Sequence, residues 1–265
     1  MKIIGELINA SRKVIATAIE NQDREAIQKV ASDQFENGAD FIDVNAGIFV
    51  DKEADHLKWL VSNVQEVVDA PCCIDSPDPQ AIEAALSLHK GTAMINSISL
   101  EKDRCDALLP IVAGTNLKVV ALCMSDAGMP QTVEDRMKIA DELVNKLLQK
   151  NVLMDNIYVD PLVQPIATKD DFGIEFINAV EEIMTTFEGI HTICGLSNIS
   201  YGLPERKYLN QAFMIMAIAK GLDAAIVNPL DKRMMANIIA AEALAGKDSF
   251  CMNYLKAFRA KKFEF

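Results

Sequence analysis

Eight short apolar segments that run into polar residues are the feature that most constrains the fold of this chain. The segments are Lys2–Glu6, Phe41–Asp43, Cys72–Asp75, Ala93–Asn96, Val119–Ser125, Ile157–Asp160, Thr192–Ser197 and Ala224–Asn228. Their nearly continuous apolar character is typical of parallel strands that are buried on both faces. Because helical patterns alternate with them, the sequence predicts an α/β fold, a TIM (β/α)8 barrel. The active site of such a barrel lies where the strands end.

The chain length fits one barrel. The sequence has 265 residues, close to the roughly 250 of a typical TIM barrel. We therefore expect residues 1–265 to form a single domain, with an extra C-terminal helix near 248–262. The expected strands cover residues 2–9, 40–45, 72–75, 93–98, 118–124, 156–160, 191–197 and 223–228. Thr132 and Asp135 have the spacing of a capping box, which predicts a helix that runs to Lys150.

Charge and composition exclude several classes of function. The net charge of −12 argues against a nucleic-acid partner, which requires a basic face. No apolar stretch approaches the roughly 18 residues of a membrane span. The six cysteines and three histidines show no metal-ligand spacing, so we expect no metal held by the protein. Scattered free thiols are typical of a reducing compartment, and we expect a cytoplasmic protein.

Polar residues at the strand ends suggest what the barrel binds. Asp75, Asn96 and Asp160 end three strands, and two of them are embedded in apolar runs, where a buried carboxylate needs partners. A carboxylate accepts two N–H groups side by side, and an amide both donates and accepts. The 2-amino-4-oxo-pyrimidine ring of a pterin offers this combination of groups.

Two other interpretations of these residues remain open. An Asp after a strand commonly caps the next helix, and this is the favoured interpretation of Asp78. Carboxylates at a barrel mouth can also bind a metal, as in enolases. The absence of a Lys or His base at a strand end weakens the metal interpretation.

Six motifs in series resemble one family. They are Gly5-Glu6-Leu7-Ile8-Asn9, Asp43-Val44-Asn45-Ala46-Gly47, Ile74-Asp75-Ser76, Ile95-Asn96-Ser97, Asp160-Pro161-Leu162 and Gly195-Leu196-Ser197-Asn198. The chain is similar in these motifs to the methyltetrahydrofolate:corrinoid/iron–sulfur protein methyltransferases, from residue 2 to about 256. The folate domain of cobalamin-dependent methionine synthase is a more distant relative. Leu7 departs from the pattern, because many relatives have Arg there.

The resemblance implies an activity and a site. The family moves a methyl group between N5 of tetrahydrofolate and the cobalt of a corrinoid, so 5-methyltetrahydrofolate or tetrahydrofolate is the expected substrate. Catalytic roles are implied for Asn198, near N5, and for Asp160. Folate-binding roles are implied for Asp75, Asn96, Asp160, Asn198, Arg206, Glu6, Asp43, Asn45 and Gly195, with Arg206 near the folate tail.

The resemblance also implies partners. The chain lacks the Asp-x-His-x-x-Gly motif of a cobalamin-binding domain, so we expect the cobalamin to be carried by a separate corrinoid protein. Relatives are homodimers, and the apolar segment 213–219 is expected to be a buried helix or a subunit interface. The alternatives are a dihydropteroate synthase-like pterin enzyme, whose Asp-Ser-Phe-Ser and Arg-x-His motifs are absent, and a non-catalytic folate-binding module.

Overall fold

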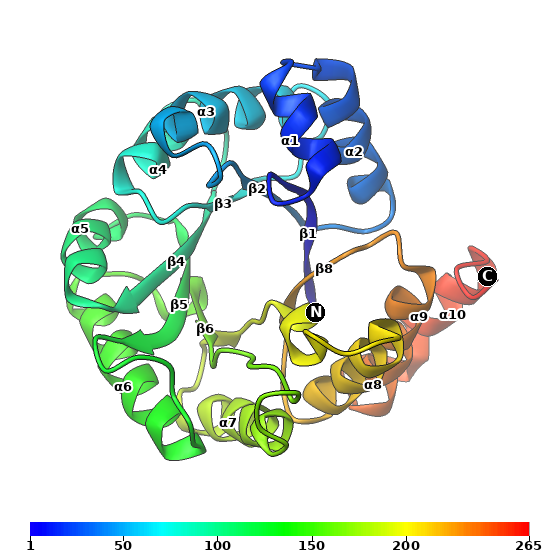
Figure 1. The fold of residues 1–265 in the computed structure, drawn as a ribbon. Helices are drawn as coiled ribbons and strands as arrows, with labels where there is room; N and C mark the ends of the chain where they lie inside the picture. Colours follow the sequence, from blue (N-terminus) through cyan, green and yellow to red (C-terminus); the bar gives the residue numbers. More distant parts are fainter. Residues whose placement is uncertain (265) are drawn as a thin grey trace.

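Residues 1–264, the part of the chain that the structure describes, form eight parallel strands surrounded by helices. Figure 1 shows this computed structural model along the axis of the barrel. Neighbouring strands follow chain order, and β1 pairs with both β2 and β8. The strands are β1 (Lys2–Asn9), β2 (Phe41–Asn45), β3 (Cys72–Asp75), β4 (Met94–Leu100), β5 (Lys118–Ser125), β6 (Ile157–Asp160), β7 (His191–Thr192) and β8 (Ala224–Val227). The predicted (β/α)8 barrel is confirmed.

Strand β7 is much shorter than the predicted range 191–197. It covers His191–Thr192, and a 3-10 helix, η3, follows at Leu196–Ser200. The barrel closes here through a bridge between Gly195 and Ile226, and the Ile226 N–H donates to Cys194 O over 2.9 Å. The apolar run at 193–196 therefore reflects burial rather than a long strand, and this part of the prediction was wrong.

Helices surround the strands on the outside of the barrel (Figure 1). They are α1 (Lys13–Glu20), α2 (Arg24–Glu36), α3 (Glu53–Val64), α4 (Pro79–Leu86), α5 (Lys102–Val112), α6 (Val133–Gln149), α7 (Phe172–Thr186), α8 (Arg206–Ala219), α9 (Lys232–Leu244) and α10 (Met252–Arg259). Three further short 3-10 helices are η1 (Val50–Lys52), η2 (Met154–Asn156) and η4 (Ser249–Cys251). No helix within residues 1–264 has the length and apolar character needed to cross a bilayer.

Local signals explain where several helices begin. The predicted capping box is present, since Thr132 Oγ1 accepts from Asp135 N over 3.1 Å at the start of α6. Asp78 caps α4, as its interpretation as a helix cap predicted. Helix α1 was not predicted, because its β-branched residues have low helix propensity. Its buried residues Ile15, Ala18 and Ile19 nevertheless have helical spacing.

The C-terminal helix is shorter than the predicted range 248–262. The Asp248 carboxylate accepts from the backbone N–H groups of Asn253 and Tyr254, both over 2.9 Å. Phe250 and Cys251 have positive φ angles of 55° and 56°. These residues form a turn, so helix α10 begins only at Met252.

The inside of the barrel has an apolar floor. One residue from each strand or its extension contributes to it: Ile4, Phe41, Cys73, Met94, Val120, Tyr158, Ile193 and Ala224. Because side chains alternate between the faces of a strand, the residue two positions later also points into the barrel. That second layer consists of Glu6, Asp43, Asp75, Asn96, Leu122, Asp160, Gly195 and Ile226. Five polar side chains thus lie on an apolar floor at the carboxyl ends of the strands.

Arg136 of α6 connects this helix to the turn that follows β6. Its side chain is fully buried, and its guanidinium donates to Pro161 O over 2.8 Å, Thr132 O over 3.1 Å and Leu162 O over 3.4 Å. The turn at 161–162 comes directly after Asp160. Arg136 therefore helps to hold the backbone that presents Asp160 to the barrel interior.

Replacing Arg136 should destabilise the protein. We expect Arg136→Met to lower the free energy of unfolding by about 2–4 kcal/mol, because three carbonyl groups lose a charged donor. Urea denaturation measures this change. The control Lys138→Met, on the exposed face of the same helix, should stay within about 0.5 kcal/mol of wild type. Equal effects of the two substitutions would contradict the role of Arg136.

Candidate active site

A cavity of about 810 Å³ opens above the apolar floor at the carboxyl ends of the strands. This volume is in the usual range for a small-molecule site. All eight residues of the second layer line it. Of the nine predicted site residues, eight line the cavity: Glu6, Asp43, Asp75, Asn96, Asp160, Gly195, Asn198 and Arg206. The fold therefore gathers residues that are up to 200 positions apart in the sequence.

Asn45, the ninth predicted residue, does not line the cavity but hydrogen-bonds to Asp75. Its Nδ2 donates to Asp75 Oδ2 over 2.9 Å, and its Oδ1 accepts from Gly47 N over 3.0 Å. Burial raises the pKa of Asp75, while the hydrogen bond from Asn45 and the charge of Arg104 oppose that rise. Asn45 thus favours the carboxylate form of Asp75.

Asp160 is held in a fixed orientation by the backbone. Its Oδ1 accepts from Leu162 N over 2.8 Å, and Gly195 N–H also donates to the carboxyl group. Burial raises its pKa to about 7, although these hydrogen bonds and the charge of Arg136 oppose the shift. The carboxyl group therefore lies close to its titration point near neutral pH.

Two further carboxyl groups in the cavity have raised pKa values. Burial raises the pKa of Glu6, and the charges of Arg12 and Arg206 oppose this rise. Burial and the nearby charge of Asp75 raise the pKa of Asp43 well above its ordinary value. The cavity thus collects carboxyl groups that become easier to ionise when a ligand supplies donors or positive charge.

Two arginines bring positive charge to the cavity. Arg206, the first residue of α8, donates to Ser197 O over 2.5 Å and to Ser200 Oγ over 3.0 Å. Arg12 donates to Leu7 O over 3.2 Å and also lines the cavity. Arg12 remains exposed to solvent while it lines this rim of the cavity. Arg12 lies in the tight turn after β1, where its position could not be inferred from local pattern.

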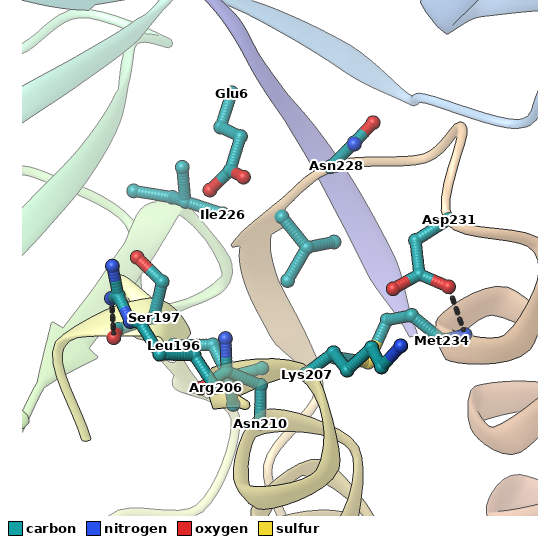
Figure 2. A pocket seen from close by; sticks show the side chains of 11 residues that line it. Glu6, Leu196, Ser197, Arg206, Lys207, Asn210, Ile226, Asn228, Asp231 and Met234 are labelled. Carbon is teal, nitrogen blue, oxygen red and sulfur yellow. Dashed lines mark hydrogen bonds between the residues drawn. The ribbon is translucent and has the colours of Figure 1, made fainter. Parts of the chain in front are cut away.

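A side pocket of about 320 Å³ opens beside the main cavity. Figure 2 shows the side chains that line this pocket. The side pocket and the main cavity share residues including Glu6, Ser197, Arg206 and Asn228. Lys207 also lines the side pocket, so basic groups from the start of α8 lie along its wall. An elongated ligand with an acidic end can extend from the main cavity into this pocket.

Asn198 lies in η3, exposed at the rim of the cavity. The family resemblance implied catalytic roles for both Asp160 and Asn198. The structure connects the two through backbone, because the Asp160 carboxyl binds the N–H of Gly195 and Gly195 immediately precedes η3. Within residues 1–264, the Asn198 side chain makes no hydrogen bond, so its amide remains available to a ligand.

The donor set suits an organic ligand. Within residues 1–264, no group of three or more His, Cys, Asp or Glu side chains is arranged to hold a metal ion. Asp75 and Asp160 offer carboxylate acceptors, and Asn96 offers an amide that both donates and accepts. A flat heterocycle with several N–H groups matches these side chains above an apolar floor.

Sequence comparisons identify relatives across nearly the whole chain. The family model described as pterin binding enzyme matches residues 5–228. A methylcorrinoid:tetrahydrofolate methyltransferase of Eubacterium limosum is 39% identical over 264 residues, which are 99% of this chain and 97% of that protein. Methionine synthase of Mycobacterium leprae is 31% identical over 85% of this chain, but the match covers 20% of that longer protein.

Solved structures share the fold. A dihydropteroate synthase from Coxiella burnetii, in complex with pteroic acid, superposes with a TM-score of 0.73 at 16% identity and covers 92% of this chain and 93% of that chain. A 7,8-dihydropteroate synthase from Vibrio fischeri gives a TM-score of 0.70 at 16% identity and covers 93% of each chain. At this identity the similarity concerns the barrel fold.

The raised pKa of Asp160 predicts a pH-dependent stability difference. An acid whose pKa rises from 3.8 to about 7 on folding stabilises the folded state below pH 3.8, and this contribution is lost as the pH rises through 7. The free energy of unfolding of Asp160→Asn should therefore rise relative to that of wild type between pH 4 and pH 8. The expected change is on the order of 2–4 kcal/mol. Urea denaturation at both pH values measures this gap. The same difference at both would contradict the assignment.

Proposed function

The chain belongs to the family of pterin-binding enzymes, and we propose that it transfers a methyl group between a corrinoid and N5 of tetrahydrofolate. One observation carries the proposal: Asp75, Asn96 and Asp160 meet in one cavity above an apolar floor. The nearly full-length similarity to a methylcorrinoid:tetrahydrofolate methyltransferase supports the reaction. Fold alone would not distinguish this chemistry from other pterin chemistry.

Folate binding uses the carboxylates and the amide. Asp75 and Asp160 accept hydrogen bonds from the exocyclic amine and the ring N–H groups of the pterin, and Asn96 binds an edge with both donor and acceptor character. The pterin ring packs on the apolar floor. The glutamate tail extends toward Arg206 and the side pocket, where Lys207 adds positive charge.

The chemical step occurs at N5. When the methyl group moves to folate, the N5–carbon bond forms, the carbon–cobalt bond breaks, and N5 releases its proton to the solvent. In the opposite direction N5 must gain proton character before the methyl group leaves. The corrinoid supplies or accepts the methyl group and keeps the electron pair of the carbon–cobalt bond. No nucleophile from the protein is required.

Asn198 stabilises charge changes at N5. Its amide is exposed at the rim, without a hydrogen bond within residues 1–264, so it can rotate toward N5. An amide that hydrogen-bonds at N5 stabilises the transition state without adding a charge of its own. Asp160 orients this region through its bond to Gly195 N–H.

The corrinoid is brought by a partner protein that docks over the barrel mouth. Exposed apolar side chains lie on three loops at this end: Val50 is 78% exposed, Met129 56% and Tyr201 67%. These loops follow β2, β5 and β7. They surround the cavity, so a corrinoid-carrying protein that contacts them brings its cobalt toward N5.

Methyl transfer can be tested with free methylcobalamin and tetrahydrofolate. We expect the corrin absorbance to change only when protein and both substrates are present. Asn198→Ala should lower the rate about 10²-fold, because one hydrogen-bond partner at N5 is lost. Its folate dissociation constant should change much less, by about threefold.

The matched control is Asn116→Ala, at an exposed site outside the cavity with an ordinary backbone conformation. It should leave the rate of methyl transfer unchanged. Equal losses of rate and folate affinity in Asn198→Ala would contradict the role of Asn198. Tight folate binding without any corrin spectral change would favour the non-catalytic folate-binding module.

The cysteines are compatible with a cytoplasmic protein. All six are free thiols, of which five are buried and Cys251 is exposed. Disulfides are uncommon in a reducing compartment. Cytoplasmic localisation is part of the proposal.

A homodimer is also part of the proposal. In the segment 213–219, Phe213, Met214 and Ile218 are buried, whereas Met216 is 50% exposed. Near the C-terminus, Leu244 is 87% exposed, and further apolar side chains of the α9–α10 region are exposed: Phe250, Met252, Leu255 and Phe258. Exposed apolar surface of this kind commonly marks a protein interface.

Light scattering after size-exclusion chromatography tests the dimer. Wild type should have twice the 29.1 kDa mass of the chain. Replacing both Phe250 and Phe258 by Ser should shift the equilibrium toward monomer, because apolar contact area is lost. Leu153→Ser, at a 59% exposed site near β6, is the control and should remain dimeric. A monomeric wild type would contradict the proposal.

A further inference from the structure

Asp43 is a buried carboxyl group inside the barrel whose contact with the ligand the proposed reaction leaves unassigned. It lies on β2, is 2% exposed and lines the main cavity. Its Oδ1 atom is buried and has no hydrogen-bond partner within residues 1–264. Buried polar atoms are nearly always hydrogen-bonded in folded proteins. An unpartnered oxygen at the wall of a binding cavity therefore points to a ligand contact.

Negative groups surround Asp43 on neighbouring strands. Of these negative charges, that of Asp75 on β3 raises the pKa of Asp43 most, and that of Glu6 on β1 raises it further. The thiol of Cys73 and the amide of Asn96 hydrogen-bond to the carboxyl and favour its ionised form. Burial and the two carboxylates outweigh these bonds, so the pKa of Asp43 lies well above its ordinary value.

Arginine side chains lower the pKa of the carboxyl groups next to Asp43. Among the described residues, the charge of Arg104 lowers the pKa of Asp75, and the charges of Arg12 and Arg206 lower that of Glu6. Arg104 is positioned by its hydrogen bonds to Ser97 O, over 2.7 Å, and Ser76 O, over 3.3 Å. Glu53 of α3 opposes the ionisation of Asp75.

The two adjacent carboxyl groups are therefore unequal. Asp75 receives a hydrogen bond from Asn45 and the positive charge of Arg104, and both favour its carboxylate form. Asp43 is more deeply buried, and its largest charged influence is the negative charge of Asp75. When two neighbouring carboxyl groups share one proton, it resides on the group whose charge is less stabilised. That group is Asp43.

We propose that Asp43 keeps a proton while folate is bound, so that Asp75 carries the negative charge of the pair, and that the Oδ1–H of Asp43 donates a hydrogen bond to an acceptor atom of the pterin ring. This inference rests on the proposed function. A carboxylate can only accept hydrogen bonds, whereas a carboxylic acid can also donate one. Asp43 thus supplies a donor that complements the two acceptors, Asp75 and Asp160.

The charge requirement at the two positions gives the first test. Tetrahydrofolate binding is measured by calorimetry at pH 7.5 under anaerobic conditions. Asp43→Ala should weaken binding about tenfold, the effect of one lost hydrogen bond. Asp43→Asn should restore the affinity, because its neutral amide can still donate. Asp75→Asn should remain at least about tenfold weaker than wild type, because a charged acceptor is lost.

The pH dependence gives the second test. Ionisation of Asp43 removes its donor and places a second negative charge beside Asp75, so wild-type affinity should fall as the pH is raised above 7.5 and Asp43 loses its proton. In Asp43→Asn this fall should be absent. Asp78→Asn is the matched control, because Asn also caps helices and residue 78 does not line the cavity. It should keep the wild-type pH profile.

The outcomes separate this inference from the proposed function. Wild-type folate affinity that does not fall at any alkaline pH at which the protein stays folded would overturn the role of Asp43, whatever the variants do. Failure of Asp43→Asn to restore binding, with thermal unfolding unchanged, would show that a carboxylate is needed there and would also overturn it. Absence of folate binding by wild type at every pH would overturn the proposed function itself.

Discussion

The two-residue repeat of the barrel strands is the constraint on which the site depends. Ile4 and Glu6 point to the same side of β1, as do Tyr158 and Asp160 of β6. In every strand or its extension the first of these positions belongs to the apolar floor and the second to the cavity wall. A shift of one residue in a strand would turn its polar side chain into the surrounding helix layer.

The same arrangement has an energetic cost. It places the carboxyl groups of Glu6, Asp43, Asp75 and Asp160 where water is largely excluded, and the pKa of each is raised. The fold compensates with a limited set of partners, among them Asn45 and the backbone N–H of Leu162. A ligand that brings N–H donors relieves the remaining cost. The residues that bind folate in our proposal therefore destabilise the folded protein when no ligand is bound.

The sequence was sufficient for the fold and for eight of the residues that line the cavity. Strand ends such as Asp75 and Asp160 could be recognised because a polar residue that closes an apolar run is conspicuous. The end of β7 could not be predicted from the sequence, because the apolar residues 193–196 are buried in the core without belonging to the strand. Asn45 has the same local pattern as its neighbours, yet it supports Asp75 instead of lining the cavity.

The sequence by itself determined the order of strands and helices and which polar residues reach one end of the barrel, since hydrophobic periodicity is a local property of the chain. Only the tertiary structure decided how these groups act on one another. The charges of Arg12 and Arg206 lower the pKa of Glu6, and the charge of Arg104 lowers that of Asp75. The charges of Asp75 and Glu6 raise the pKa of Asp43. Electrostatic interactions depend on distance and burial in space, and residues that are far apart in the chain set both.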